Sequence, residues 1–354
     1  MLKTKGPLFD TERARSTIEK GRRKTWWRRT GNTSRTFKYL DQQGNAVRDK
    51  DAIQRIRSLV IPPAWQFVRI NPFAAGKIQA VGMDSTGRVQ YIYHPTFSAR
   101  QKKNKFARME RFGAMLPKLR EATNRDIALE GLPREKVLAV VMRLINSLYF
   151  RVGTDHSARH YKTFGITTLQ KRHLTRGNKG KLSFQFVGKS HIEHRKVIVD
   201  EELAAIVKEL LNIKRGRKLF RYLSEDGKPR PVTPSQINAY IKAATGPEFS
   251  SKDFRTWGAT VLTAAELAIA GVADTETEKK RKMVSVIKRV AEELGNTPAV
   301  CRESYVHPTV LKAYAAGTTI DEFRPRADRR IKRKAEDLDP EEKAVMRLLQ
   351  SYGR

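Results

Sequence analysis

The spacing of apolar residues changes partway along this chain of 354 residues. In roughly the first ninety, short runs alternate apolar and polar side chains, as half-buried β-strands do. The turn signals Gln43-Gly44-Asn45 and Asp84–Gly87 each separate two such runs, and Pro62-Pro63 ends a helical pattern over Ile53–Leu59. The expected strands are Thr36–Leu40, Ala46–Arg48, Gln66–Ile70, Lys77–Met83 and Arg88–Tyr93.

Beyond residue 105 the apolar positions recur at about 3.6 residues, the period of an amphipathic helix. The expected helices are Phe106–Leu119, Glu135–Phe150, Glu202–Leu211, Pro234–Ala244, Trp257–Ala270 and Glu278–Leu294. A β interlude falls among them, with strands expected at Gly165–Leu169, Lys181–Val187 and Ile192–Val199. The tight turn Gly188–His191 joins the last two strands into a hairpin.

These patterns predict an α+β protein. A small β-rich N-terminal domain is expected over residues 1–95. A larger, mainly α domain that holds a small antiparallel sheet is expected over residues 96–325. The basic run Arg100–Lys105 is expected to be a linker between them, and residues 326–354 are expected to form a charged C-terminal tail, helical or partly frayed.

The charge balance indicates the class of partner. The chain has 71 Lys and Arg against 37 Asp and Glu, a net charge of +34, while 39% hydrophobic residues are enough for a packed core. Such an excess repels itself in a compact chain unless a polyanion shares the field, so nucleic acid is the expected partner. The N-terminus lacks the apolar region of a secretory signal, and no apolar stretch is long enough to span a bilayer. We therefore expect a soluble, cytoplasmic protein.

The sequence argues against several kinds of chemistry. It has no glycine-rich phosphate loop, so no nucleotide cofactor is expected, and it lacks the acidic clusters that hold paired metal ions. The single cysteine, Cys301, excludes internal disulfides and is expected to be a buried, inert thiol. His156 and His160 could share a helix face as metal ligands, but two ordinary polar histidines are favoured. His191 and His194 are interpreted as solvated or DNA-facing side chains.

Several segments, taken in order, carry a more specific signal. In the second half they are Phe150–Gly153 followed by Phe164–Leu169, Phe186–Ser190, Lys252–Gly258, and Leu294–Val300 leading to Ser304–Pro308. In the first part they are Val60–Trp65 and Gln79–Pro95. Together they resemble the type IB DNA topoisomerases, in their compact bacterial and poxvirus-like form. The resemblance implies a monomer whose two lobes clamp double-stranded DNA at the nucleoid. It would relax supercoils without ATP or another cofactor, through a 3′-phosphotyrosyl intermediate.

The resemblance also implies a role for each of five residues. Tyr305 would attack the scissile phosphorus, and Arg151 and Arg255 would bind its non-bridging oxygens. Lys189 would protonate the departing 5′-oxygen. Asn296 lies nine residues before Tyr305, where many relatives carry a histidine, and would donate a hydrogen bond to the phosphate.

Each of the five also has a purely structural interpretation. Tyr305 could pack at an interface, and Lys189 could be ordinary turn surface. The remaining structural alternatives are Arg151 capping a helix or pairing with Asp155, Arg255 pairing with Asp253 or Glu248, and Asn296 capping a helix end after Gly295. In the basic-aromatic run Arg22–Arg29, we expect one of Trp26 and Trp27 to pack in the core and the other to lie along DNA.

Two other functions compete with topoisomerase activity. Tyrosine recombinases share the Arg, Lys, Arg and Tyr chemistry, but they usually carry a histidine three residues before the second arginine, where this chain has Lys252. Their N-terminal domain is usually helical, whereas this one is predicted to be β-rich. A non-catalytic chromosomal binder would explain the charge but would leave the ordered motifs unexplained. The sequence therefore favours the topoisomerase.

Overall fold

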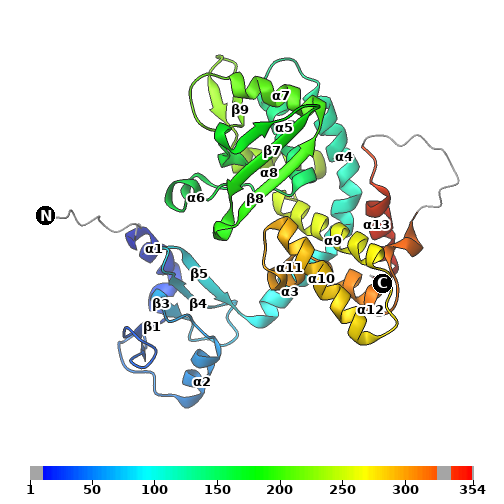
Figure 1. Ribbon diagram of the computed structural model, residues 1–354. Coiled ribbons are helices and arrows are strands. Elements are labelled where there is room, and N and C mark those ends of the chain that lie inside the picture. Colours follow the sequence, from blue (N-terminus) through cyan, green and yellow to red (C-terminus); the bar gives the residue numbers. More distant parts are fainter. Residues whose placement is uncertain (1–10, 325–335, 353–354) are drawn as a thin grey trace. The chain divides into compact units, whose positions relative to one another are not determined.

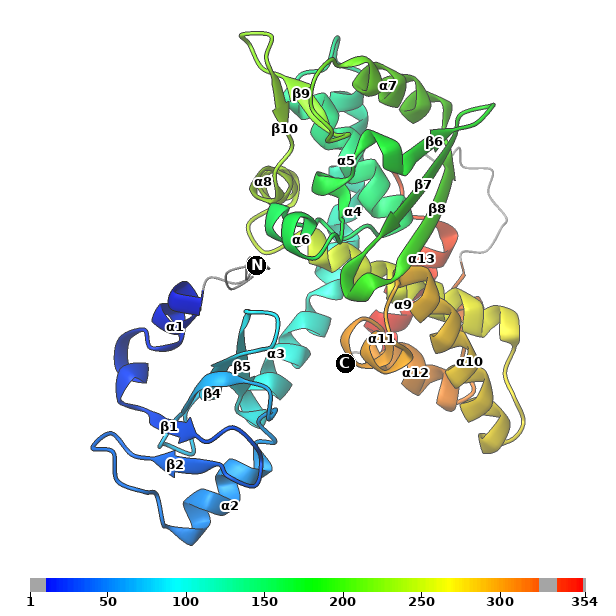
Figure 2. The same cartoon turned by 60° about the vertical axis from the view of Figure 1, so that its left-hand side comes forward.

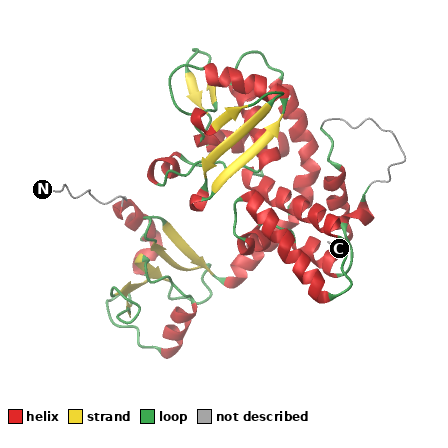
Figure 3. Ribbon diagram, in the orientation of Figure 1, coloured by secondary structure: helices red, strands yellow, loops and turns green. Residues whose placement is uncertain are grey.

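The computed structural model describes residues 11–324 and 336–352, and the chain forms two compact units that divide between Lys105 and Phe106 (Figure 1). The first unit is built on a small antiparallel sheet, and the second is mainly helical with a smaller sheet (Figure 3). The expected α+β fold class is confirmed. Among the described helices, none has the length and apolar character needed to cross a bilayer.

The sheet of the first unit has five antiparallel strands in the order β2-β1-β3-β4-β5. They are β1 (Trp27–Thr30), β2 (Lys38–Leu40), β3 (Gln66–Ile70), β4 (Ile78–Met83) and β5 (Val89–Tyr93). Helices α1 (Thr11–Ile18) and α2 (Lys50–Ser58) each pack against the sheet, and each forms a separate buried cluster with it. Val81 packs with α1 and Ala80 packs with α2, because successive residues of a strand point to opposite faces. The sheet is therefore covered on both sides.

The two neighbouring tryptophans follow the same rule. Trp26 packs against the cluster that contains α1, and Trp27 packs against the cluster that contains α2. The guanidinium of Arg55 lies 5.5 Å from the Trp27 ring centre. The expectation that only one of them packs in the core is wrong, since the sheet buries apolar side chains on both faces.

The expected linker is helical. Arg100–Lys105 lies within α3 (Pro95–Ala107), and the two units divide after this run rather than after residue 95. Lys, Arg and Gln are good helix formers, and proline is tolerated in a first helical turn, so a dense positive charge does not by itself make a flexible linker.

Helices of the second unit surround one continuous core. They are α4 (Met109–Ile127), α5 (Arg134–Leu148), α6 (Asp155–His160), α7 (Glu201–Asn212), α8 (Pro234–Thr245), α9 (Ser251–Ala270), α10 (Glu276–Leu294), α11 (Pro298–Ser304), α12 (Pro308–Ala315) and α13 (Pro340–Tyr352). Its strands are β6 (Leu174–Arg176), β7 (Lys181–Val187) and β8 (Glu193–Val199) in one antiparallel sheet, and β9 (Arg221–Leu223) with β10 (Pro229–Pro231) in a two-stranded ribbon. Figure 2 shows the β7–β8 hairpin with its turn toward the helices around α9.

The segment Gly165–Leu169, expected as a strand, is a short 3-10 turn over Ile166–Thr168. Its backbone bonds to the loop after α5: Ile166 N donates to Arg151 O at 2.8 Å. The two backbones lie so close that a Cβ added to Gly165 would lie 2.5 Å from that same oxygen. The segment therefore supports Arg151 instead of joining a sheet.

The expected C-terminal tail is largely part of the core. Residues 326–335 and 353–354 lie outside the described residues, but α13 buries Ala344, Val345, Leu348 and Leu349. Glu342, only 6% exposed, accepts hydrogen bonds from Arg120 and from Trp257 Nε1 of α9. The helical alternative expected for the tail is confirmed over Pro340–Tyr352, but the apolar residues of this helix belong to the core.

Candidate active site

Arg151 lies in the loop that follows α5. Tyr149 ends the helix in the left-handed conformation, with φ 55°. Phe150 then buries its ring against Phe184 and Phe186, with centroid distances of 5.3 and 5.6 Å. With its neighbour anchored in the core, Arg151 is held at a fixed point of the loop.

The Arg151 guanidinium binds the carboxyl end of α10. Its nitrogens donate to the carbonyl oxygens of Leu294 at 3.4 Å and Gly295 at 3.0 Å, and to Oδ1 of Asn296. The last carbonyls of a helix lack partners within the helix and carry the negative end of its dipole, so they attract cations.

Arg255 reaches the same helix end from α9. Its guanidinium donates to Leu294 O at 2.7 Å and to Tyr149 O at 2.5 Å, and the residue is 5% exposed. Burial, together with the smaller effect of the Arg151 charge, lowers the pKa of Arg255 to about 10. The group is still a cation at neutral pH, so two guanidinium groups converge on one helix end.

The ion pairs suggested as alternatives for these arginines do not form between the described residues. Asp155 pairs with Lys218 at 2.6 Å. Asp253 pairs with Arg108 at 3.0 Å, and Glu248 pairs with Arg111. Both arginines therefore use carbonyl oxygens as acceptors.

Asn296 has the helix-capping role considered for it, and its side chain lies beside the arginines. Gly295 is left-handed, and the backbone N–H of Asn296 donates to Ala291 O at 2.8 Å, which terminates α10. The side-chain oxygen accepts from Arg151, whereas Nδ2 is buried and has no hydrogen-bond partner among the described atoms. An unused donor thus lies beside the arginine pair.

Tyr305 follows directly on α11 and is half-buried. Its ring lies under the Arg255 guanidinium, at 5.3 Å from carbon to ring centre. The hydroxyl of Thr260 donates to Tyr305 O at 3.3 Å and accepts from His307 N at 3.1 Å, which fixes the backbone on both sides of Val306. The nearby Cys301 is fully buried, as expected, and burial raises its pKa to about 11.

Lys189 lies at the tip of the β7–β8 hairpin, where it is exposed. The two residues after it, Ser190 and His191, are left-handed, with φ 64° and 57°. Lys189 lines a narrow cleft together with Arg151 and Arg255. The structure therefore brings the hairpin tip beside the two arginines. Asn296 contacts Arg151, and Tyr305 contacts Arg255, so both residues lie next to this cleft.

Two further residues of this cleft were missed in the sequence. Lys196 is buried on β8. Its Nζ donates to the carbonyl oxygen of Glu293 at 2.5 Å and also pairs with the Glu293 carboxylate. His194 is 8% exposed and stacks on Phe186 at 5.0 Å, so the expectation that it is solvated or DNA-facing is wrong. Burial, with smaller effects from Arg151, Lys196 and Arg255, lowers the pKa of His194 to about 4, and the ring is neutral at pH 7.

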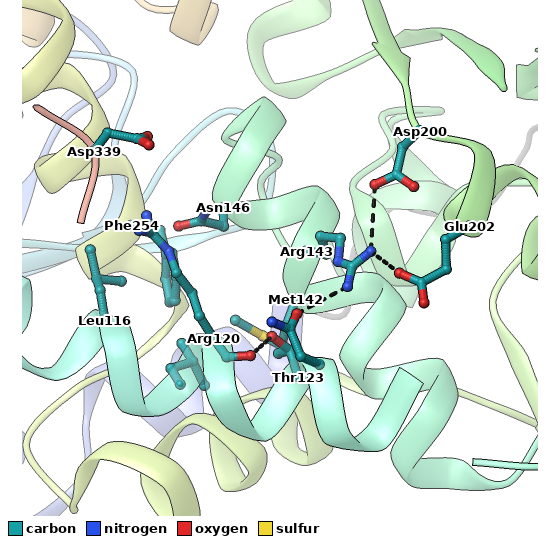
Figure 4. Close-up of a pocket in the computed structure, with 12 residues that line it drawn as sticks. Leu116, Arg120, Thr123, Met142, Arg143, Asn146, Asp200, Glu202, Phe254 and Asp339 are labelled. Atoms are coloured by element: carbon teal, nitrogen blue, oxygen red, sulfur yellow. Dashed lines mark hydrogen bonds and ion pairs between the residues drawn. The ribbon is translucent and has the colours of Figure 1, made fainter. Parts of the chain in front are cut away.

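A larger cavity of about 520 Å³ lies elsewhere in the second unit, between α4 and α5 and beside the start of α7. Within it Arg143 pairs with Asp200 and Glu202 (Figure 4). Arg143 also donates to Asn124, and Arg120 pairs with Glu342. None of the five residues singled out in the sequence lines it. Among the described residues, no three His, Cys, Asp or Glu side chains gather as a metal site, and the His156 and His160 rings pack on each other at 4.5 Å.

Comparisons with known proteins cover both units. The family described as eukaryotic DNA topoisomerase I, catalytic core, matches residues 94–331, and bacterial DNA topoisomerase IB, N-terminal domain, matches residues 36–84. DNA topoisomerase 1B of Acanthamoeba polyphaga mimivirus is 33% identical over 285 residues, which cover 78% of this chain and 83% of the viral protein. DNA topoisomerase 1B of Vaccinia virus (strain Copenhagen) is 24% identical over 255 residues, which cover 69% and 77%.

Proposed function

Because the chain belongs to the type IB DNA topoisomerases, we propose that the residues gathered at the carboxyl end of α10 form its active site. They are Tyr305, Arg151, Arg255, Lys189 and Asn296. The enzyme relaxes supercoiled DNA by transient cleavage of one strand. The observation that carries the assignment is the convergence of two guanidinium groups beside the ring of Tyr305.

In the proposed reaction the Tyr305 hydroxyl attacks the scissile phosphorus. The Tyr305 Oη–P bond forms, the bond from phosphorus to the 5′-oxygen breaks, and the tyrosine proton goes to solvent water. Lys189 gives a proton to the leaving 5′-oxygen, so that a 3′-phosphotyrosyl ester and a free 5′-hydroxyl result. The free strand rotates, and reversal of the same steps reseals it. Because the ester retains the energy of the broken bond, resealing needs no ATP.

The arginines are suited to stabilise the charge that builds up on phosphorus. In the free protein their donors bind helix carbonyls, which are partial negative charges fixed in position. Phosphate oxygens are stronger acceptors and match the planar guanidinium fork. The unused Nδ2 of Asn296 offers one more donor beside them. The pair is therefore organised before DNA binds, which lowers the cost of reaching the transition state.

Double-stranded DNA is the proposed substrate, bound by a monomer that closes on the duplex as a two-lobed clamp. The net charge of +34 supports affinity through phosphate contacts that carry little sequence information. Such contacts also make binding strongly dependent on salt. We place the enzyme in the cytoplasm, on the DNA of the nucleoid.

Purified protein is expected to relax negatively supercoiled plasmid at moderate salt in EDTA and without ATP. The physical reason is that cations of the chain itself supply the phosphate charge neutralisation that metal ions supply in other enzymes. Plasmid relaxation on agarose gels measures the result. A chromosomal binder would shift the plasmid without changing its linking number, and a recombinase would need two specific sites. Complete loss of relaxation in EDTA would contradict the metal-free mechanism.

Lys189→Ala is expected to slow single-turnover cleavage of a normal phosphodiester by about 100- to 10,000-fold, the range for loss of a general acid. A suicide substrate with sulfur in place of the 5′-bridging oxygen should be cleaved at nearly the wild-type rate. The thiolate that leaves has a conjugate acid with a pKa near ~8.5, against ~15.7 for water, and needs little protonation.

The alternative role of Lys189, tethering DNA through a groove or backbone contact, predicts equal defects on both substrates. Arg151→Ala and Arg255→Ala provide the comparison, because charge on the non-bridging oxygens must be neutralised whichever atom leaves. Both arginine variants should remain slow on the sulfur-bridged strand. Equal defects for Lys189→Ala would make it a positioning residue and would leave the assignment of Tyr305 intact.

A further inference from the structure

His194 fills the space between the two segments that carry the catalytic groups. On one side, a Cβ added to Gly188 would lie 2.5 Å from its Cδ2 and Nε2 atoms. On the other side, a Cβ added to Gly295 would lie 2.2 Å from its Cε1 atom. Both positions are glycine, so the imidazole touches two backbones directly. Gly188 precedes Lys189, and Gly295 precedes Asn296.

The ring is itself held in place. It stacks on Phe186 with an interplanar angle of 17°, and Phe186 and His194 are direct partners in the β7–β8 ladder. Two residues further along β8, Lys196 bonds to Glu293 at the end of α10. The inward face of β8 thus joins the hairpin to the helix end that holds both arginines.

We propose that His194 is a positioning residue that sets the distance between Lys189 and the two catalytic arginines. This inference rests on the proposed function, since it takes Lys189 as the general acid. Backbone hydrogen bonds hold the end of β7, where Phe164 N donates to Val187 O and Gly188 N donates to Ile192 O, both at 2.8 Å. Beyond them Lys189 is exposed, and the two residues after it have left-handed backbones. The imidazole adds a side-chain contact at the Gly188 backbone, directly before Lys189.

The histidine acts through its shape. A ring that is neutral at pH 7 adds no positive charge to a site that already holds Arg151, Arg255 and Lys196. Its flat face also fits between two backbones where a larger side chain would push them apart. Truncation to alanine would open a space beside Gly188 and would release the hairpin tip, whereas the arginines would keep their bonds to α10.

The test measures single-turnover cleavage of the normal and the 5′-sulfur-bridged substrates by the full chain. His194→Ala is expected to be slowed by about 10- to 100-fold on the normal strand, the scale for a catalytic group displaced by about 1 Å. On the sulfur-bridged strand it should be close to wild type, because the displaced lysine is no longer needed. His194→Gln, which reaches as far as the distal ring nitrogen, should recover much of the loss.

The comparison is internal, since both rates come from one preparation and their ratio does not depend on the folded fraction. Val197→Ala is the matched control on the same strand, because Val197 is 52% exposed on the opposite face of β8, and it should leave both rates unchanged.

Equal slowing of His194→Ala on the two substrates would overturn the inference and indicate a contact with phosphate or general damage. If Lys189→Ala also fails to be rescued by sulfur, the error lies in the acid assignment of the proposed function. If Lys189→Ala is rescued and His194→Ala is not, only the positioning role is wrong.

Discussion

Tyr305→Phe is expected to abolish DNA cleavage and plasmid relaxation while DNA affinity stays nearly unchanged. The substitution removes the one atom that would bond to phosphorus. It keeps the ring that packs under Arg255 and the backbone that Thr260 holds, so the surface that binds phosphate is preserved. Capture of the covalent complex in detergent measures cleavage, and a gel-shift titration measures affinity.

Tyr352→Phe is the matched control for this prediction. Tyr352 is 43% exposed, and its hydroxyl bonds to Thr318 at 3.1 Å in a different part of the second unit. Its loss should leave relaxation at the wild-type rate. Relaxation by Tyr305→Phe at a comparable rate would show that another residue forms the ester, and the site would have to be reassigned.

Arg255→Ala is expected to slow cleavage by at least about 100-fold, the scale for loss of one donor to a developing oxyanion. Arg151→Ala should have an effect of the same order, because both groups converge on the same helix end. Lysine at either position should restore activity only in part, since an ammonium group lacks the planar fork. Quenched-flow cleavage of a suicide substrate gives the rates.

Arg255 is buried, so its loss also removes bonds to Tyr149 O and Leu294 O. Thermal unfolding monitored by circular dichroism separates a stability loss from a catalytic one, and the Arg255→Lys variant retains the positive charge. Arg281→Ala, an exposed change near the start of α10, removes one positive charge away from the site and should cleave normally. Wild-type single-turnover rates for Arg255→Ala or Arg151→Ala would remove that arginine from the active site.

The elements predicted well from sequence are those whose apolar residues recur with a strong period and whose ends are marked by turn or capping residues. Strands β3 and β7 begin and end where the alternation of apolar residues places them, and α8 begins at the expected Pro234. Predictions failed where tertiary contact overrides local pattern. Gly165–Leu169 has strand-like residues, but the close approach of Gly165 to Arg151 O leaves room only for a turn. In α3 high charge concealed ordinary helix formers, and in α13 it concealed that the expected helix packs into the core.

The candidate site could be predicted only in part from the sequence, because tertiary packing also decides which residues surround the catalytic side chains. Side chains with a chemical role stand in ordered motifs, whereas residues that brace them are defined by packing. In β8 the outward Val197 and Val199 are apolar, whereas two of the three inward residues, His194 and Lys196, are polar, which departs from the usual expectation for a strand. The usable signal was the pairing of His194 and Lys196 with Phe186 and Phe184 across the hairpin.

Helix α13 has a consequence for the order of events during synthesis. A growing chain folds from its N-terminal side as it is made, and Tyr305 is translated before residues 340–352. Until α13 exists, Trp257 lacks the Glu342 acceptor, and the helix that carries Arg255 is missing one side of its packing. Tyr305 is therefore synthesised before the core around Arg255 is closed. We expect the two proposed catalytic residues to be aligned only once the chain has been made through α13.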